Sequence, residues 1–485
     1  MLKLIIKQAN WGILGSLFGF AIGFIVKVYL IDIVGISEWG KYVSAHVFAT
    51  AFDTFLAIGI PFVLLKFIPD YLEKNKEAAN FMIKKSLRYA VNISIIFMIM
   101  MYFLAPYFDQ YLYKEIEGFS FILLLVSLHV PIAIFTGIIT SLYRSVFKIK
   151  EIILYGTFVA VPLRAILTFI IFQFTDNIVY FIGIEIFTTT LSMVLLFYLY
   201  NKKEVSLLNI KSENQKFDAN VIPYGKKIYA NSLVSFFANQ SLSLILSIML
   251  PPNEIGIFSI LLTITGISLF IIQNLNKVFA PAISKLYAEG KINELNQMFK
   301  TTTFIVNFIT IPFTILIIYF AKELLMLYDS SGNILNYLPY LYVLMAARII
   351  ALLAGSSGTF MVMAGLEKKE LVIQTAKAIL ITVLALLFTK EYGLLSIVTL
   401  FIVFTLFINI FQLFFINKEI NINPFSKNLF FLIILSIPLF YYAINNDNQF
   451  NIYQVFWVPI ILYLTYILVF YKSIRVLYFD IFRND

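Results

Sequence analysis

The chain has 485 residues, of which 61% are hydrophobic and only 13% are charged. A soluble domain carries about 25% charged residues, so the composition predicts an integral membrane protein. The sequence contains no cysteine, which excludes disulfides, thiolate metal sites and cysteine nucleophiles. Its two histidines are too few for a histidine-cluster metal centre. The formal net charge of +9 follows from the placement of basic residues around spanning helices, and no nucleic-acid partner is expected.

Apolar stretches of about 20 residues follow one another along the sequence, separated by short polar segments. That length suits a helix that crosses a hydrocarbon core about 30 Å thick, whereas a membrane barrel would show alternating segments of about ten residues. We therefore predict an all-α polytopic membrane protein with about fourteen transmembrane helices. The expected spans are 10–34, 41–68, 86–106, 119–145, 152–175, 178–200, 223–250, 254–282, 301–321, 333–365, 371–389, 392–416, 427–444 and 452–471.

The Lys and Arg residues predict the orientation, because cytoplasmic loops are enriched in them. With a cytoplasmic N-terminus, most of the 36 basic residues fall in cytoplasmic segments or at cytoplasmic helix ends. The exceptions are Lys41, Lys114, Lys322 and Lys390 on the opposite side, and Lys27, Arg164, Lys277, Arg348 and Lys377 within spans. Both termini are therefore expected in the cytoplasm, and the first apolar run is expected to be a retained span.

The domain organisation follows from the longest polar connection. Residues 201–222 are rich in lysine and follow the sixth span, so they are expected to form a cytoplasmic linker. The prediction is an N-lobe at 1–200 with spans 1–6 and a C-lobe at 223–416 with spans 7–12. Residues 417–485 then hold spans 13–14 and a cytoplasmic tail.

A sequence repeat relates the two predicted lobes. The segments Gly35–Tyr42 and Pro251–Phe258 align at an offset of 216, which pairs Glu38 with Glu254 and Gly40 with Gly256. At an offset of 219, Lys150-Glu151 falls on Lys369-Glu370. Six spans separate the copies, and an even number leaves both in the same orientation. The expectation is two six-helix lobes in a parallel pseudo-two-fold repeat, plus two C-terminal helices.

These features resemble a known family. A chain of fourteen spans, with an E-x-G-x-[YF] connector after spans one and seven and a basic hinge before spans five and eleven, is similar to the polysaccharide flippases. These belong to the superfamily that also holds the multidrug-and-toxin extruders and the lipid II flippase. The resemblance implies a V-shaped transporter of the bacterial cytoplasmic membrane that moves an undecaprenyl-diphosphate-linked oligosaccharide, the repeat unit of O-antigen, capsule or exopolysaccharide, to the periplasmic leaflet. Its partners would be this lipid-linked oligosaccharide, membrane lipids, and the polymerase and glycosyltransferases of the pathway.

Charged residues within the spans are candidate site residues, because a charge inside a membrane is costly and is therefore usually functional. When histidine is counted as neutral, the candidate residues named below carry five positive and two negative charges. This balance favours an anion such as a diphosphate. Expected substrate-binding residues are Arg348, Arg164, Lys27, Lys277 and His129, and Asp53 and Glu185 are candidates for proton or sodium coupling or for partners of these cations. Lys377 completes the set.

Each of these residues also has a structural explanation. Lys27 and Lys277 can snorkel toward a membrane surface, and Arg164 can be neutralised by Glu185 or Asp53. His129 can be a satisfied core residue. Arg348 is the strongest candidate, because it lies halfway along its span. At the offset of 219 it takes the position of His129, so both lobes can present a basic side chain at equivalent places.

Uncharged polar side chains mark a possible sugar path. Asn239 and Gln240 in the seventh span, and Gln273 and Asn276 in the eighth, carry amides that can hydrogen-bond sugar hydroxyls. Hydrogen bonds between helices are the alternative explanation.

Several other functions remain open. A multidrug-and-toxin extrusion antiporter shares the architecture but handles cations, and a lipid II flippase takes a similar anionic substrate. A membrane glycosyltransferase or polymerase is less favoured, because the outer loops are short and no catalytic constellation occurs; the chain is not expected to be an enzyme. No G-x-x-x-x-G-K-[ST] loop occurs, so nucleotide hydrolysis within this chain is not expected, and neither is a metal or an organic cofactor.

Overall fold

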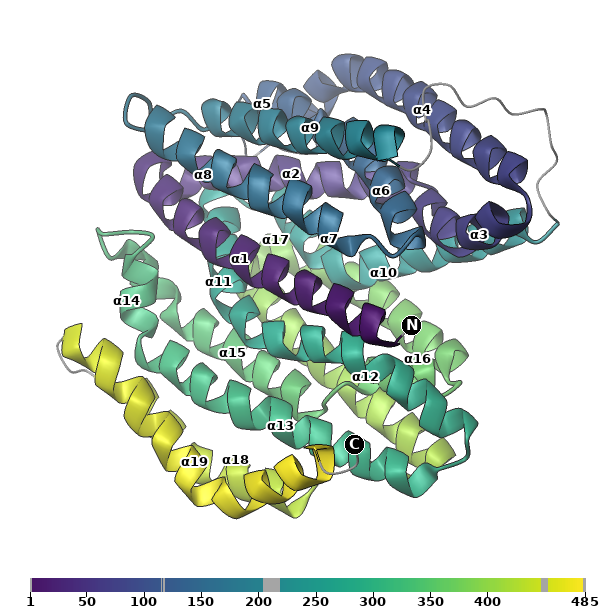
Figure 1. The fold of residues 1–485 in the computed structure, drawn as a ribbon. Coiled ribbons are helices and arrows are strands. Elements are labelled where there is room, and N and C mark those ends of the chain that lie inside the picture. Colours follow the sequence, from purple (N-terminus) through teal and green to yellow (C-terminus); the bar gives the residue numbers. More distant parts are fainter. Residues whose placement is uncertain (1, 115, 117, 204–218, 446–451, 483–485) are drawn as a thin grey trace. The chain divides into compact units, whose positions relative to one another are not determined.

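The computed structural model describes residues 2–114, 116, 118–203, 219–445 and 452–482. Nearly all of these residues are helical, and none of them forms a strand (Figure 1). The predicted all-α class is thus confirmed. Most of the predicted linker, at 204–218, lies outside the described residues.

Each predicted span overlaps at least one helix in the described part of the chain. Eleven helical stretches there are long and apolar enough to cross a membrane, and a twelfth forms when α2 (Ile36–Leu56) and α3 (Ile60–Lys74), bent by 44°, are taken together. The 54-residue helix α17 (Glu367–Ile420) contains a break at Gly393 and covers the two expected spans 371–389 and 392–416. The last predicted span falls on α19 (Ile452–Phe482), whose segment Trp457–Tyr471 is a shorter apolar helix.

The chain divides into two compact units by its internal contacts. The first unit comprises residues 1–259 and 382–394, and the second comprises 260–381 and 395–485. The predicted lobes follow the sequence repeat instead, and that division stays a prediction. The remaining helices of the first unit are α1 (Leu2–Val34), α4 (Lys76–Tyr111), α5 (Phe119–Ser127), α6 (His129–Ser145), α7 (Ile149–Glu151), η1 (Ile152–Thr157), α8 (Phe158–Ile171), α9 (Ile178–Lys203) and α10 (Val221–Met249), with the start of α11 (Pro252–Gly266).

A broken helix lines the interior of the first unit. Between α2 and α3 the backbone turns at Ile58 and Gly59, which have φ angles of 39° and 72°. Pro61 is the second residue of α3 and lies in its first turn, where its missing N–H costs nothing. The break allows α10 to come close, because a Cβ atom at Gly59 would lie 3.3 Å from the side chain of Ile228.

The glycines of α1 are a packing surface where they meet η1. A Cβ atom at Gly15 would lie 2.7 Å from the side chain of Ile153, and one at Gly19 would lie 3.4 Å from Thr157. The π-helix η1 leads directly into α8. π-helical turns are frequent at functional sites, and η1 directly precedes the helix that carries Arg164.

The second unit is built around its own apolar core. Phe299 and Phe360 stack with ring centroids 4.6 Å apart, and Leu295 and Met361 are fully buried beside them. Its remaining helices are η2 (Ile267–Leu269), α12 (Phe270–Ala288), α13 (Ile292–Tyr319), α14 (Ala321–Met326), η3 (Asn333–Tyr337), α15 (Leu338–Leu353), α16 (Ser357–Met363) and α18 (Lys427–Ile444), which it holds together with α19 and most of α17.

Candidate functional site

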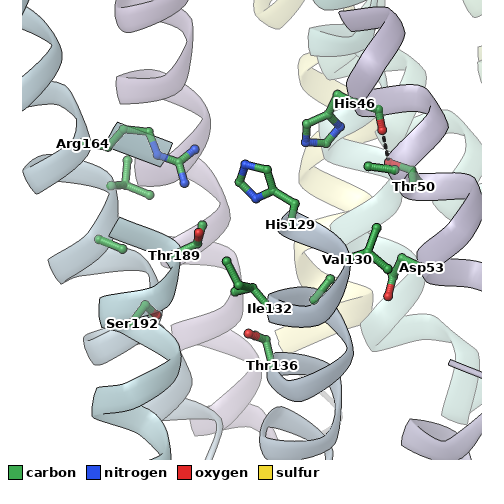
Figure 2. Close-up of a pocket in the computed structure, with 15 residues that line it drawn as sticks. His46, Thr50, Asp53, His129, Val130, Ile132, Thr136, Arg164, Thr189 and Ser192 are labelled. Atoms are coloured by element: carbon green, nitrogen blue, oxygen red, sulfur yellow. Dashed lines mark hydrogen bonds between the residues drawn. The ribbon is translucent and has the colours of Figure 1, made fainter. Parts of the chain in front are cut away.

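A cavity of about 360 Å³ lies among α2, α6, α8, α9 and η1 in the first unit. Figure 2 shows that Arg164 and His129 point toward one another across this cavity, with His46 and Asp53 on the α2 side. Three of these four side chains were expected site residues, although they come from three different helices. We call this space the charged cavity.

A second cavity, of about 650 Å³, adjoins the first. Thr50, Asp53 and Ala133 line both spaces, so the two meet along α2 and α6. Amide and hydroxyl side chains of α10 form much of its wall, and we call it the amide cavity. Its α10 lining includes Asn231, Ser232, Ser235, Asn239 and Gln240.

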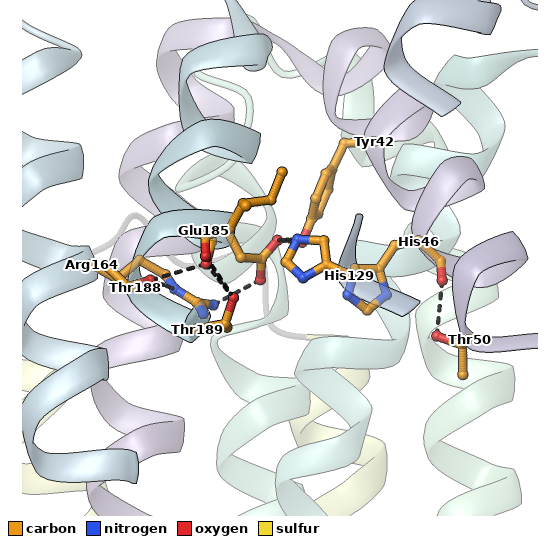
Figure 3. Close-up of polar contacts among 9 residues, drawn as sticks. Tyr42, His46, Thr50, His129, Arg164, Glu185, Thr188 and Thr189 are labelled. Atoms are coloured by element: carbon orange, nitrogen blue, oxygen red, sulfur yellow. Dashed lines mark hydrogen bonds and ion pairs between the residues drawn. The ribbon is translucent and has the colours of Figure 1, made fainter. Parts of the chain in front are cut away.

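Glu185 on α9 organises the polar contacts at the charged cavity. Its side chain is buried, with 7% exposure. One carboxylate oxygen, Oε1, accepts a hydrogen bond of 2.8 Å from Nη1 of Arg164, and Oε2 accepts one of 2.7 Å from the hydroxyl of Tyr42. Nε2 of His129 lies 3.3 Å from Oε2, an ion-pair distance, although its angle is not that of a hydrogen bond (Figure 3).

Local helix geometry holds Arg164 in place. The residue follows Pro162 in α8, and its Nε donates to Oγ1 of Thr188 at 3.3 Å. Glu185 and Thr188 are three residues apart on α9 and therefore present neighbouring side chains to α8. Of the two carboxylates that could neutralise Arg164, Glu185 and Asp53, it is Glu185 that forms the ion pair. The pair fixes the guanidinium while its side chain keeps 24% exposure toward the cavity.

The imidazoles of His46 and His129 are neighbours. Their ring centroids are 5.9 Å apart, and His46 lies 5.6 Å from the ring of Tyr42. The His46 side chain is exposed to the cavity, and it makes no hydrogen bond or ion pair with a described residue. The hydroxyl of Thr50, one turn further along α2, donates its hydrogen bond to the backbone carbonyl of His46.

The charge of this cavity depends on the two imidazoles. Arg164 and Glu185 neutralise each other, and the Asp53 carboxylate makes no ion pair with another described residue. With neutral histidines the group is therefore negative by one charge, and with both protonated it is positive by one. Arg164 alone does not make the cavity cationic.

The structure places Lys27 away from these two cavities. Its Nζ donates hydrogen bonds of 3.0 Å to both the carbonyl and the hydroxyl of Ser259 and lies 5.1 Å from the centroid of Trp39. Trp39 also donates to the Ser259 hydroxyl at 3.2 Å. In these contacts Lys27 ties α1 to α11.

Asn239 and Gln240 both line the amide cavity. Nδ2 of Asn239 donates to the carbonyl of Ser235 at 2.9 Å and leaves its side-chain oxygen available. The other two predicted amides belong to the second unit, where Gln273 is exposed and Asn276 accepts a hydrogen bond from Ser356. Hydrogen bonding between helices thus accounts for Asn276.

Arg348 occupies a different environment in the second unit. Its guanidinium lies over the ring of Phe401, 4.8 Å from the centroid, and its Nε has no hydrogen-bond partner among the described residues. Lys377 lies within electrostatic range of it. Because no described carboxylate pairs with Arg348, its charge is not neutralised as that of Arg164 is. The predicted Lys277 side chain lies outside the described part of the structure.

The start of α9 and the start of the second part of α17 align the sequence around Glu185 with the sequence around Phe401. The helix α9 begins at Ile178, and α17 resumes at Leu394 after its break, 216 residues later. At that offset Glu185 corresponds to Phe401. At the predicted offsets, the carboxylate of Glu185 beside His129 corresponds to the aromatic ring of Phe401 beside Arg348.

A family sequence model for polysaccharide biosynthesis proteins matches residues 5–287, which is more than half of the chain. The chain belongs to this polysaccharide biosynthesis protein family. No curated protein sequence gives a significant match. The matched region includes every residue that lines the charged cavity and the amide cavity.

Solved structures share the fold of this family member at low sequence identity. The lipid II flippase MurJ, in an inward closed conformation, is 15% identical, with a TM-score of 0.72 and coverage of 95% of this chain and 98% of that one. An inward-facing multidrug resistance MATE family transporter of the MOP superfamily is 13% identical, with a TM-score of 0.65 and coverage of 82% and 98%. A MOP superfamily transporter from Pyrococcus furiosus is also 13% identical, with a TM-score of 0.60 and coverage of 86% and 96%. These likenesses establish a common fold.

The sequence did not lead us to expect Tyr42 or His46 at the charged cavity. Tyr42 served only as a marker of the repeat, and His46 was not among the expected binding residues. Their spacing held a signal, because positions 42, 46, 50 and 53 recur at intervals of three or four and therefore share one face of a helix. Among the described residues, no group of three His, Asp or Glu side chains is arranged to hold a metal ion.

Proposed function

We propose that this protein moves an undecaprenyl-diphosphate-linked oligosaccharide repeat unit from the cytoplasmic to the periplasmic leaflet of the bacterial cytoplasmic membrane. The observation that carries the proposal is the junction of a charged cavity with an amide cavity. A lipid-linked repeat unit has the same two parts, an anionic diphosphate and a neutral glycan. Membership of the polysaccharide biosynthesis protein family supports this substrate class.

The diphosphate would bind at the charged cavity. Arg164 is held by Glu185 in a fixed orientation, and its Nη2 makes no hydrogen bond to a described residue. A planar guanidinium suits phosphate oxygens, because it offers parallel N–H donors. Arg348 and Lys377 of the second unit are further cations that would attract the same group during transport.

The glycan would occupy the amide cavity. Its volume of about 650 Å³ lies within the range of about 300–1,000 Å³ that is usual for ligand pockets. The amides of Asn231, Asn239 and Gln240 can both donate to and accept from sugar hydroxyls. Asp53, at the junction, would face the first sugar after the diphosphate.

Transport would proceed by alternating access, with both termini in the cytoplasm. In this scheme the lipid tail remains in the bilayer while the polar head passes through the interior. Asp53 is the candidate for proton or sodium coupling, because its carboxylate lines both cavities without an ion-pair partner among the described residues. Glu185 is less suited to that role, since three side chains surround its carboxylate.

A lipid II flippase is the second candidate, and it is favoured by the TM-score of 0.72 to MurJ. Lipid II also joins an isoprenoid diphosphate to a saccharide, so the charged cavity fits either substrate. A multidrug extruder, the third possibility, would take cationic substrates and would not need Arg348 or Arg164.

Complementation separates these functions. The gene would be expressed in one strain that lacks a surface-polysaccharide flippase and in another depleted of its lipid II flippase. Restored surface polymer in the first strain alone supports the proposal, and rescued growth of the second strain alone favours the lipid II function. The variants Arg164→Ala and Arg348→Ala should lower the polymer at equal membrane abundance, with Arg144→Ala and Lys390→Ala as controls at exposed positions. Wild-type polymer from both site variants would overturn the binding roles.

A further inference from the structure

The only two histidines of the 485-residue chain lie beside the same cavity. They are 83 positions apart in sequence and come from α2 and α6, yet their ring centroids are 5.9 Å apart. We propose that the His46–His129 pair takes up a proton when an isoprenoid diphosphate enters the charged cavity, so that the substrate binds together with a proton. This inference rests on the proposed function and adds to it how the charge of the site is regulated.

The first step of the argument is the charge of the empty site. The charged groups near the imidazoles are Arg164 on α8, Glu185 on α9 and Asp53 on α2. The charge of Arg164 is neutralised by its ion pair with Glu185. The negative charge of the Asp53 carboxylate is then not balanced. A diphosphate with two or three negative charges would meet net repulsion in a cavity with neutral imidazoles.

The second step is the response of the imidazoles. An unperturbed histidine changes its charge within the physiological pH range, and a nearby anion favours the protonated form. The approaching diphosphate is such an anion, and Oε2 of Glu185 already lies 3.3 Å from Nε2 of His129. The Glu185 carboxylate is already paired with Arg164, so the diphosphate brings unpaired negative charge to the imidazoles. Proton uptake is therefore coupled to the arrival of the ligand.

The remaining neighbours do not take over this role. Tyr42 donates its hydroxyl hydrogen to Glu185 and is occupied by that bond. The helix α5, which packs against α2, contains no titratable side chain between Phe119 and Ser127. The α10 residues that line the adjoining amide cavity are uncharged. Asp53 lines the same cavity and can also change its charge, but protonation of its carboxylate brings the group only to neutrality. Among the described residues that line the cavity, the two imidazoles are thus the groups that can make it positive.

The test measures affinity against pH with farnesyl diphosphate as the probe. The full-length protein is purified with a tag that contains no histidine, and binding is followed by calorimetry at pH 6, 7 and 8 in buffers of different ionisation enthalpy. Linkage to one proton changes the affinity by up to about tenfold per pH unit. We expect the wild type to bind more weakly as the pH rises and to take up about one proton on binding.

Two variants make the test specific to the imidazoles. The double variant His46→Asn/His129→Asn should lose most of this pH dependence and retain only the parts that come from titration of the probe and of Asp53. His46→Arg carries a permanent charge and should bind at pH 8 as tightly as the wild type binds at pH 6. A merely structural role for His46 would not produce this rescue. Thermal unfolding of each variant in the same detergent checks that it is folded.

The outcomes separate this inference from the proposed function. An unchanged pH dependence in the double variant would overturn the role of the histidine pair while leaving diphosphate binding intact. Absence of wild-type binding at every pH would overturn the proposed function and this inference together. Loss of the pH dependence in the double variant, with rescue by His46→Arg, would support both.

Discussion

Gly40 and Gly256 pack against the start of each other's helix. A Cβ atom at Gly40 would lie 1.8 Å from the carbonyl oxygen of Pro252, and one at Gly256 would lie 2.2 Å from that of Ile36. Gly40 follows Ile36 by four residues and Gly256 follows Pro252 by four, and both pairs are 216 residues apart. The contact is thus reciprocal, as in a two-fold related interface, where residue i contacts j and j contacts i. The glycines of the repeated E-x-G-x-[YF] connector are therefore the points where its two copies touch.

Either glycine should be intolerant of a methyl group. Gly40→Ala and Gly256→Ala force two helix backbones apart, and overpacking of this kind costs about 1–3 kcal/mol or more. We expect a lower thermal unfolding midpoint in detergent for both variants. The matched control is Gly12→Ala, because a Cβ atom there meets nothing within 4 Å and alanine is the better helix former. Midpoints equal to that of the control would contradict the close contact.

Glu185 should stabilise the first unit only while Arg164 is present. Glu185→Leu leaves the guanidinium unpaired, and removal of one partner of a buried pair costs about 3–5 kcal/mol. The 24% exposure of Arg164 places the expected loss at the lower end. The double variant Arg164→Met/Glu185→Leu should regain most of the stability, because no charge is left without a partner. A double variant less stable than Glu185→Leu alone would contradict this account.

Hydropathy predicted the helices well because membrane spans have a fixed minimum length. The expected span 427–444 coincides with α18, and the expected start at 178 coincides with α9. The break at Ile58 and Gly59 within the expected span 41–68 was not predicted. Ile58 is an unusual residue for a positive φ angle, and the helix that packs closely against the break, α10, is distant in sequence.

The site could be predicted only in part, because a sequence gives the depth of a charge along a helix but not its partner on another helix. Arg164, His129, Glu185 and Asp53 were expected and do converge. Lys27 was also an expected substrate-binding residue, with snorkelling toward the membrane surface as its structural explanation. Its hydrogen-bond partner, Ser259, is 232 residues away, and nothing in the local pattern of α1 indicates that contact.

Lys27 should therefore contribute to stability more than to substrate affinity. Lys27→Met removes two hydrogen bonds of 3.0 Å to Ser259, and bonds from a charged donor contribute about 1.5–3 kcal/mol each. We expect a lower unfolding midpoint but an unchanged dissociation constant for farnesyl diphosphate. Arg164→Met should instead weaken the binding of farnesyl diphosphate more than it lowers the unfolding midpoint. Equal losses of affinity in both variants would contradict this prediction and place Lys27 in the binding site.

The amide cavity should distinguish glycosylated from bare ligands. Asn239→Ala/Gln240→Ala removes two side chains of α10 that line it, and a hydrogen bond contributes about 0.5–1.5 kcal/mol, or roughly two- to twelvefold in affinity. We expect the double variant to bind a farnesyl-diphosphate-linked disaccharide more weakly and farnesyl diphosphate itself as the wild type does. Asn445→Ala, at an exposed position of the second unit, is the control. Equal weakening for both ligands would place the diphosphate, not the glycan, beside these amides.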